Sequence, residues 1–223
     1  MHLPVEKEYV VEKTIEIDKD IEICGGRLVA SDYLDGPVIK ASRGKIKINY
    51  INGKNNICVS LFEAKYVSID VSRLEGKVGV ELFNSSFNTI SVEECITTYG
   101  IKILNNSFAN TVNKFNWIGC GSEPQCGFYT SSIDPSSGPR ANFLSGLTAR
   151  GETADLLSIN NSKNTHMIFN YVELSDNQKI LINEHSYQSE IIVNFSQNKL
   201  QRLVEIDNGL KNYSSHKIEI KGD

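Results

Sequence analysis

A unit of strand, turn and strand that recurs along the chain constrains its fold more than any other feature. Residues 80–90 read VELFNSSFNTI, residues 101–112 read IKILNNSFANTV, and residues 157–168 read LSINNSKNTHMI. In each copy a short alternating apolar strand precedes a polar turn that contains asparagine, and a second apolar strand follows. Alternation places Val80 and Leu82 on one face of a strand and Glu81 on the other. Repeats of roughly 20–25 residues are typical of stacked architectures in which the coils share one core.

The order of the repeats predicts parallel strands. Equivalent segments follow one another through turns, without two-residue hairpin signals or helical crossovers. Each strand is therefore expected to pair with its equivalent one coil away, about 4.8 Å along the axis. The sequence predicts an all-β parallel β-helix, a solenoid of roughly ten coils. The predicted core contains Val59, Leu61, Val80, Leu82, Ile101, Ile103, Leu157, Ile159, Ile180 and Ile182.

Polar residues recur where the first strand of each repeat ends. We interpret them as structural, because asparagine tolerates the left-handed conformation and can hydrogen-bond its own backbone at a tight corner. They are Asn84, Asn105, Asn106, Asn160, Asn161, Asn183, Asp207 and Asn208.

The turns carry a resemblance to a known family. The pattern Asn-Ser-x-x-Asn-x-(Ile/Val), at Asn84, Asn106 and more loosely Asn161, is similar to the turns of the right-handed parallel β-helix, the pectin-lyase-like family. Within that family the chain looks most like the rod of a bacteriophage tailspike, being acidic, poor in helix and rich in Asn and Ser. The resemblance implies a homotrimer in the virion tail that binds, and usually cleaves, bacterial surface polysaccharide as a glycoside hydrolase or lyase. The alternatives are a secreted polysaccharide lyase or hydrolase, and a non-catalytic carbohydrate-binding adhesin or structural spike.

The spacing of the repeats divides the chain. Residues 1–35 are expected to form an N-terminal cap and the first coils, and residues 36–223 the β-helix. A loop insertion rich in Gly, Pro and Ser is predicted at about 119–155, with one coil surviving inside it at 128–130 and 141–144. In repeat proteins such insertions map to one face, which is often the binding face.

Composition excludes several functions. The net charge is −4 and the 23 Lys and Arg residues form no run, so we expect no nucleic-acid partner. No apolar stretch approaches the roughly 20 residues of a membrane span, and the first residues lack the apolar core of a signal peptide. No motif for a metal, a phosphate or another cofactor is present. The one close pair of cysteines, Cys120 and Cys126, is compatible with two reduced thiols or with a loop-closing disulfide.

Two sets of carboxylates are candidates for catalysis. Aligning the coils puts Asp70 and Glu93 at the same outward position of neighbouring coils, about 4.8 Å apart along the axis. Retaining glycosidases hold two carboxyl groups about 5–5.5 Å apart and inverting ones about 6.5–9.5 Å apart, and stacked like charges would raise one pKa. The alternative is that these are ordinary solvent-facing charges, as Glu81 and Lys102 are expected to be. The insertion offers Asp134 and Asp155 as further acids or bases.

Aromatic and basic residues near the insertion are candidates for sugar binding. Trp117, Tyr129 and Arg140 could stack on sugar rings and bind hydroxyl groups. The alternative for Trp117 is a place in the core, facing inward from its strand. The aspartates are not clustered as in the calcium sites of pectate lyases, which counts against a calcium-dependent lyase. Leu181 and Ile192 fall at outward positions, and such apolar residues predict contacts between the chains of a trimer.

Overall fold

The structure is a computed structural model, and it describes residues 1–120, 126–151, 155–159, 162–174, 180–182, 186, 188–194, 204–206 and 217–220. Its strands are β1 (His2–Val11), β2 (Ile15–Ile17), β3 (Glu22–Ala30), β4 (Ile39–Ala41), β5 (Lys45–Asn52), β6 (Ile57–Phe62), β7 (Ser68–Phe83), β8 (Thr89–Leu104), β9 (Thr111–Gly119), β10 (Cys126–Ser131), β11 (Phe143–Gly151), β12 (Asp155–Ile159), β13 (His166–Leu174), β14 (Ile180–Ile182), β15 (Glu190–Val193), β16 (Val204–Ile206) and β17 (Lys217–Ile220). One short 3-10 helix, η1 (Pro135–Ser137), lies between β10 and β11.

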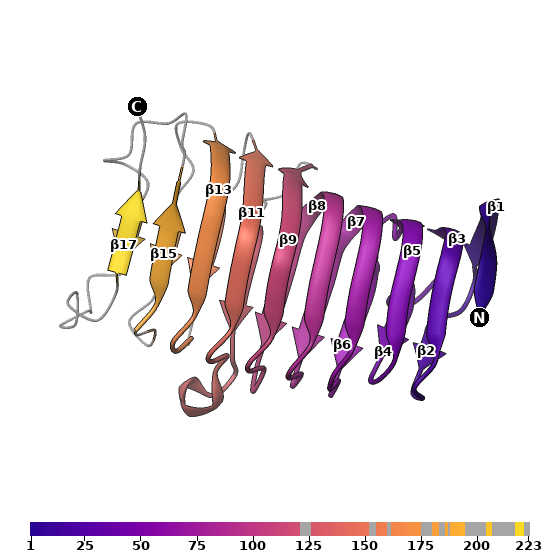
Figure 1. Ribbon diagram of the computed structural model, residues 1–223, viewed down its shortest axis with the longest axis horizontal. Helices are drawn as coiled ribbons and strands as arrows, with labels where there is room; N and C mark the ends of the chain where they lie inside the picture. The colour runs from indigo at the N-terminus through magenta and orange to yellow at the C-terminus, as the bar shows by residue number, and fades with distance from the viewer. Residues whose placement is uncertain are drawn as a thin grey trace.

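The strands form a parallel β-solenoid, which confirms the predicted fold class (Figure 1). One stack, the first sheet, runs from β2 through β4 and β6 to the second halves of β7 and β8, and then through β10, β12, β14 and β16. The other stack, the second sheet, contains β1, β3, β5, the first halves of β7 and β8, and then β9, β11, β13, β15 and β17. β7 and β8 belong to both sheets because their backbones bend from one sheet into the other.

The solenoid has about seven turns, fewer than the ten predicted. The strand order is consistent with the right-handed form that the sequence predicts. Residues 1–35 contribute regular strands, since β1 pairs with β3 and β2 pairs with β4.

The core lies between the two sheets, where inward residues stack in register. Val80 pairs with Ile101 and Leu82 with Ile103, and all four side chains are buried. Eight of the ten predicted core residues are buried; Leu157 and Ile159 pair in register with β14, but their side chains lie outside the described residues. Farther along the chain, Phe128 packs edge-to-face on Phe115 and Phe169, with ring centroids 5.7 and 5.2 Å apart.

The turns between the first and second sheets have a repeated backbone conformation. Asn84 and Asn105 are left-handed, with φ of 50° and 52°, as expected for asparagine at these corners. Asn160, Asn161, Asn183, Asp207 and Asn208 lie outside the described residues.

A buried asparagine ladder supports these turns from inside. Asn88 donates a side-chain hydrogen bond to Asn110 at 2.9 Å, and Asn110 donates one to Asn142 at 2.9 Å. All three side chains are buried. Stacking therefore supplies hydrogen bonds for polar groups that the coil removes from water, as buried amides require.

The predicted insertion is mostly regular. Phe128 of β10 pairs with Ile101, and Phe143 of β11 pairs with Thr111, so the coil expected inside the insertion is present. Only the segment 132–142, which contains η1, protrudes from the stack in this region of the described chain (Figure 1). None of the helices in the described residues is long and apolar enough to span a membrane.

Candidate functional site

Exposed aromatic rings line the turns between the two sheets. We call this surface the aromatic corner; it consists of Tyr66, Phe87, Phe108 and Arg140. The rings of Tyr66 and Phe87 stack with centroids 5.4 Å apart and planes 12° apart, and Phe87 meets Phe108 edge-to-face at 5.2 Å. The Arg140 guanidinium lies 5.2 Å from the centre of the Phe108 ring. The four side chains therefore follow the solenoid axis over successive coils.

Neither burial nor backbone preference explains these aromatic residues. Tyr66 is 73% exposed and Phe87 43% exposed, so neither ring contributes to the core. Both have left-handed backbones, with φ of 61° and 59°, at a position where the next described coils carry Ala109, Ala141 and Asn164. A left-handed conformation is unfavourable for bulky residues, and such outliers are concentrated at functional sites. The aromatic corner is therefore a candidate binding surface.

A second aromatic pair lies where β6 and β7 end and the same turns begin. Phe62 and Phe83 stack face to face, with centroids 5.3 Å apart, and the Lys40 ammonium lies 4.7 Å from the centre of the Phe62 ring. An open pocket of about 540 Å³ adjoins this pair. Its lining includes Lys40, Arg43, Phe62, Glu63 and Lys65, so it offers both charges beside an aromatic face.

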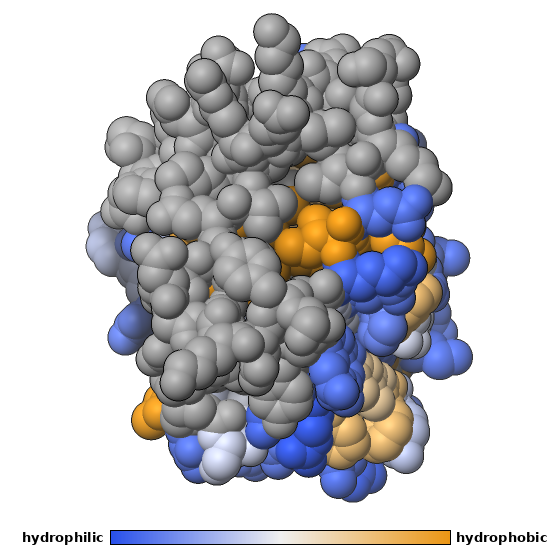
Figure 2. Space-filling model, turned by 90° about the vertical axis from the view of Figure 1, so that its left-hand side faces the viewer, coloured by the Kyte–Doolittle hydropathy of each residue, from blue (hydrophilic) through white to orange (hydrophobic). Residues whose placement is uncertain are grey.

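Viewed from the C-terminal end, the solenoid shows a pale orange hydrophobic strip near its lower edge, among blue hydrophilic side chains (Figure 2). The turns between the two sheets lie along this lower edge in Figure 1.

Asp70 and Glu93 are not aligned as the sequence predicted. Asp70 pairs with Ser91, and Glu94 rather than Glu93 pairs with Arg73. β7 and β8 pair in a regular register in which each residue lies opposite the one 21 positions later, whereas the predicted alignment matched residues 23 positions apart and is therefore shifted by two residues. Glu93 is exposed and forms an ion pair with Lys114 at 3.3 Å. The two carboxylates therefore do not form the stacked pair that was expected.

The two acids of the insertion have different outcomes. Asp134 caps η1: its carboxylate accepts hydrogen bonds from the Ser136 backbone N–H at 2.9 Å and from the Ser136 hydroxyl at 2.7 Å. These bonds hold the pKa of Asp134 below its usual value, so the group remains ionised and is a poor proton donor. Asp155 pairs through its backbone with Cys126, and its side chain lies outside the described residues, so its catalytic role stays a prediction.

The three predicted sugar-binding residues are not brought together. Trp117 is fully buried and donates from Nε1 to the Thr97 carbonyl at 3.0 Å. It is thus a core residue, which confirms the alternative that the sequence left open for it and removes it from the candidate sugar-binding residues. Arg140 belongs to the aromatic corner. Tyr129 is half-buried on the outer face of the first sheet, where it pairs with Lys102.

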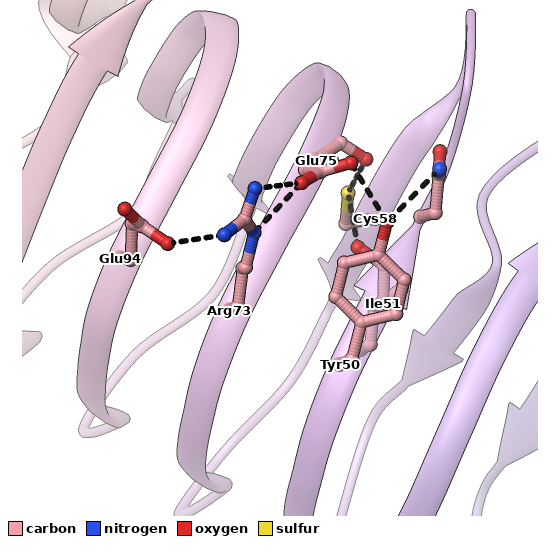
Figure 3. Close-up of polar contacts among 7 residues, drawn as sticks. Tyr50, Ile51, Cys58, Arg73, Glu75 and Glu94 are labelled. Carbon is pink, nitrogen blue, oxygen red and sulfur yellow. Dashed lines mark hydrogen bonds and ion pairs between the residues drawn. The ribbon is translucent and has the colours of Figure 1, made fainter. Parts of the chain in front are cut away.

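A cluster of polar side chains lies on the outer face of the second sheet (Figure 3). Glu75 accepts hydrogen bonds from the Tyr50 hydroxyl at 2.7 Å and from Arg73 Nε at 2.7 Å. Arg73 also pairs with Glu94 at 3.0 Å. Partial burial raises the pKa of Glu75, but the hydrogen bonds from Tyr50 and Arg73 outweigh it and lower the pKa overall. These charges satisfy one another, as in a cluster that joins neighbouring strands.

The cysteines do not suggest chemistry. All five are free thiols, including Cys120 and Cys126, which do not form the disulfide that their spacing allowed. Cys58 donates to the Glu75 carbonyl at 3.1 Å inside the fold, and burial raises its pKa to about 12. A thiol with so high a pKa is a weak nucleophile at neutral pH.

Comparison with known proteins gives no match: no family model, no curated protein and no solved structure is significantly similar to this chain. Membership of the pectin-lyase-like family, which the turn motif suggested, therefore stays a prediction.

Proposed function

We propose that this protein binds a polysaccharide along the aromatic corner, in the manner of a tailspike that attaches to the surface of a bacterium. The observation that carries the proposal is the exposed stack of Tyr66 and Phe87, continued by Phe108 and Arg140. Aromatic faces are suitable for the C–H groups of sugar rings, and adjacent polar groups are suitable for the hydroxyls.

The direction of the aromatic corner favours an extended ligand over a small one. Its members lie on successive coils, so the surface repeats about every 4.8 Å along the axis. The pocket beside Phe62 adds Lys40, Arg43 and Lys65 as hydrogen-bond donors at one end of this surface. A chain of linked sugars could contact several of these coils at once.

Binding is supported better than cleavage. Two carboxyl groups must flank the bond that a glycosidase cleaves. Asp70 and Glu93 are out of register, and Asp134 is an ionised cap. The positions of the described carboxylates therefore favour a non-catalytic spike or adhesin. An assay for new reducing ends or unsaturated products tests cleavage separately.

The test measures binding to a panel of purified capsular and O-antigen polysaccharides. Tyr66→Ala and Phe87→Ala should each weaken binding roughly tenfold, the effect of losing one aromatic contact. Tyr33→Ala is the matched control, because Tyr33 is 93% exposed and lies in a loop away from the aromatic corner. Equal affinity of all four proteins for a bound polysaccharide, or the absence of any binding by the unmutated chain, would reject the proposal.

The tailspike reading also implies a homotrimer on a virion. Leu181 and Ile192 occupy outward strand positions and are half-buried in the single chain, so an assembly would cover them further. Light scattering should give three times the 24.9 kDa mass of one chain. A single-chain mass at micromolar concentration would reject the trimer while leaving glycan binding in place.

A further inference from the structure

Three polar side chains lie side by side on the outer face of the first sheet. Ser60 of β6 pairs with Glu81 of β7, and Glu81 pairs with Lys102 of β8. Their strand neighbours, including Val80, Leu82, Ile101 and Ile103, face the core, so alternation directs these three side chains outward. We call this group the polar trough.

Aromatic side chains on both sides lower the exposure of the polar trough. Ser60 is only 6% exposed, and Glu81 and Lys102 are half-buried, although all three face outward. On one side stand the stacked rings of Phe62 and Phe83. On the other side stands Tyr99, whose ring centre is 3.9 Å from the Lys102 ammonium.

The polar groups of the trough have no hydrogen-bond partner in the described part of the protein. The Glu81 carboxylate, the Lys102 ammonium and the Ser60 hydroxyl form no hydrogen bond or ion pair there, although the Lys102 ammonium contacts the face of Tyr99. By contrast, Glu93 and Lys114 on the second sheet are exposed and lie 3.3 Å apart. Glu81 and Lys102 have lost part of their water without gaining a hydrogen bond, which is unfavourable, so hydrogen-bonding groups of a ligand would stabilise them.

The titration behaviour of the two charges agrees with this geometry. Burial raises the pKa of Glu81, although attraction to Lys102 opposes the shift. Burial likewise lowers the pKa of Lys102, although attraction to Glu81 opposes it. In both cases loss of water outweighs the neighbouring opposite charge.

We propose that Ser60, Glu81 and Lys102 form a binding site for an uncharged, hydroxyl-bearing sugar residue. The choice of a sugar rests on the proposed function, whereas the choice of an uncharged one rests on the trough itself. Glu81 and Lys102 have opposite charges on adjacent strands, and beyond Ser60 the same row continues with a second pair of opposite charges, Lys40 and Glu16. An acidic sugar drawn to Lys102 would be repelled by Glu81, and an amino sugar drawn to Glu81 would be repelled by Lys102.

Hydroxyl groups match all three side chains. One hydroxyl can donate to the Glu81 carboxylate while its neighbour on the ring accepts from the Lys102 ammonium, across strands about 4.8 Å apart. The Ser60 hydroxyl can donate or accept. The aromatic rims supply faces for the ring of the sugar, and Tyr129 continues the row beyond Lys102. No bond is made or broken in this step.

The experiment follows the side chains of the full chain by NMR while a neutral methyl glycoside, or a methyl uronide as the acidic probe, is added. The Glu81 carboxyl carbon and the Lys102 carbon next to nitrogen report on the trough. The ring signals of Tyr66 and Phe87 report on the aromatic corner. Assignment uses Glu81→Gln and Lys102→Met, and Glu93→Gln with Lys114→Met is the matched control pair on the second sheet.

We expect the neutral glycoside to shift the trough signals of the unmutated chain. It should bind at least about tenfold more weakly to Glu81→Gln, Lys102→Met or Ser60→Ala, because each variant loses one hydrogen bond to the sugar. In the first two variants the lost bond is to a charged group. The control pair should bind as the unmutated chain does. Shifts only at the aromatic corner would overturn the trough and leave the proposed function standing. Shifts only at the trough would support it and overturn the aromatic corner. Preference for the uronide at the trough, or no shift at either surface, would also overturn it.

Discussion

Replacing Asn110 by alanine should destabilise the solenoid strongly, because the asparagine ladder passes through its amide. The Asn110 side chain accepts hydrogen bonds from the Asn88 backbone N–H at 3.2 Å and the Asn88 amide at 2.9 Å. It also donates to the Ser85 carbonyl at 2.8 Å and to Asn142 at 2.9 Å. All of these groups are buried.

The magnitude follows from the groups that lose their partners. The Ser85 carbonyl still accepts from the Phe108 backbone N–H, and the Asn142 side-chain oxygen still accepts from the backbone N–H of residue 110. In contrast, the Asn88 backbone N–H and one N–H of the Asn88 amide lose the bonds that Asn110 accepted, while the other amide N–H still donates to the Ala64 carbonyl at 3.2 Å. Each buried donor left without a partner costs about 1–3 kcal/mol, so the free energy of unfolding should fall by about 2–6 kcal/mol. That is a large part of the roughly 5–15 kcal/mol that a typical domain has.

The assay is urea unfolding followed by circular dichroism, with Asn106→Ala as the control. Asn106 lies in the same turn, but its side chain is exposed, so its loss should change stability by no more than about 0.5 kcal/mol. If Asn110→Ala costs less than about 1 kcal/mol, or no more than Asn106→Ala, the ladder does not support the turns as argued.

Three further predictions concern the core, the polar trough and the thiols. Leu82→Ala should lower the free energy of unfolding by about 2–5 kcal/mol, because Leu82 is buried in the stacked core; an effect in urea unfolding no larger than that of Ile133→Ala, at a 92% exposed site, would contradict this. Glu81→Gln should raise stability at neutral pH by up to about 1 kcal/mol. Burial raises the folded-state pKa of Glu81, so the stability that the protonated carboxyl gives is complete below the usual pKa of 4.5 and is lost as the pH rises through the folded-state pKa. The gain in stability from Glu81→Gln should therefore shrink when unfolding is measured near pH 4. A gain independent of pH would refute the reasoning. A thiol reagent should label half-buried Cys120 in the native protein and buried Cys58 only after denaturation, so rapid native labelling of Cys58, identified by mass spectrometry, would contradict the described core.

The sequence by itself determined the fold class and the inner face of each coil. Alternation of Val80 with Leu82 and of Ile101 with Ile103, repeated at one spacing, leaves a parallel stack as the arrangement that buries every copy, and these residues pair in register. The asparagines at Asn84 and Asn105 also matched their corners, because left-handed backbones have local residue preferences.

The tertiary structure decided which outward residues come together. The predicted alignment of Asp70 with Glu93 matched residues 23 positions apart, whereas β7 and β8 pair at a constant separation of 21 residues, so Asp70 lies opposite Ser91. Glu81 and Lys102 were expected to be ordinary solvent-facing charges. Both are half-buried in the structure, where Phe83 and Tyr99 of their own strands and Phe62 of β6 stand beside them. Strand pairing joins residues about 21 positions apart in the chain, so the exposure of a side chain depends on coils that a local pattern does not include.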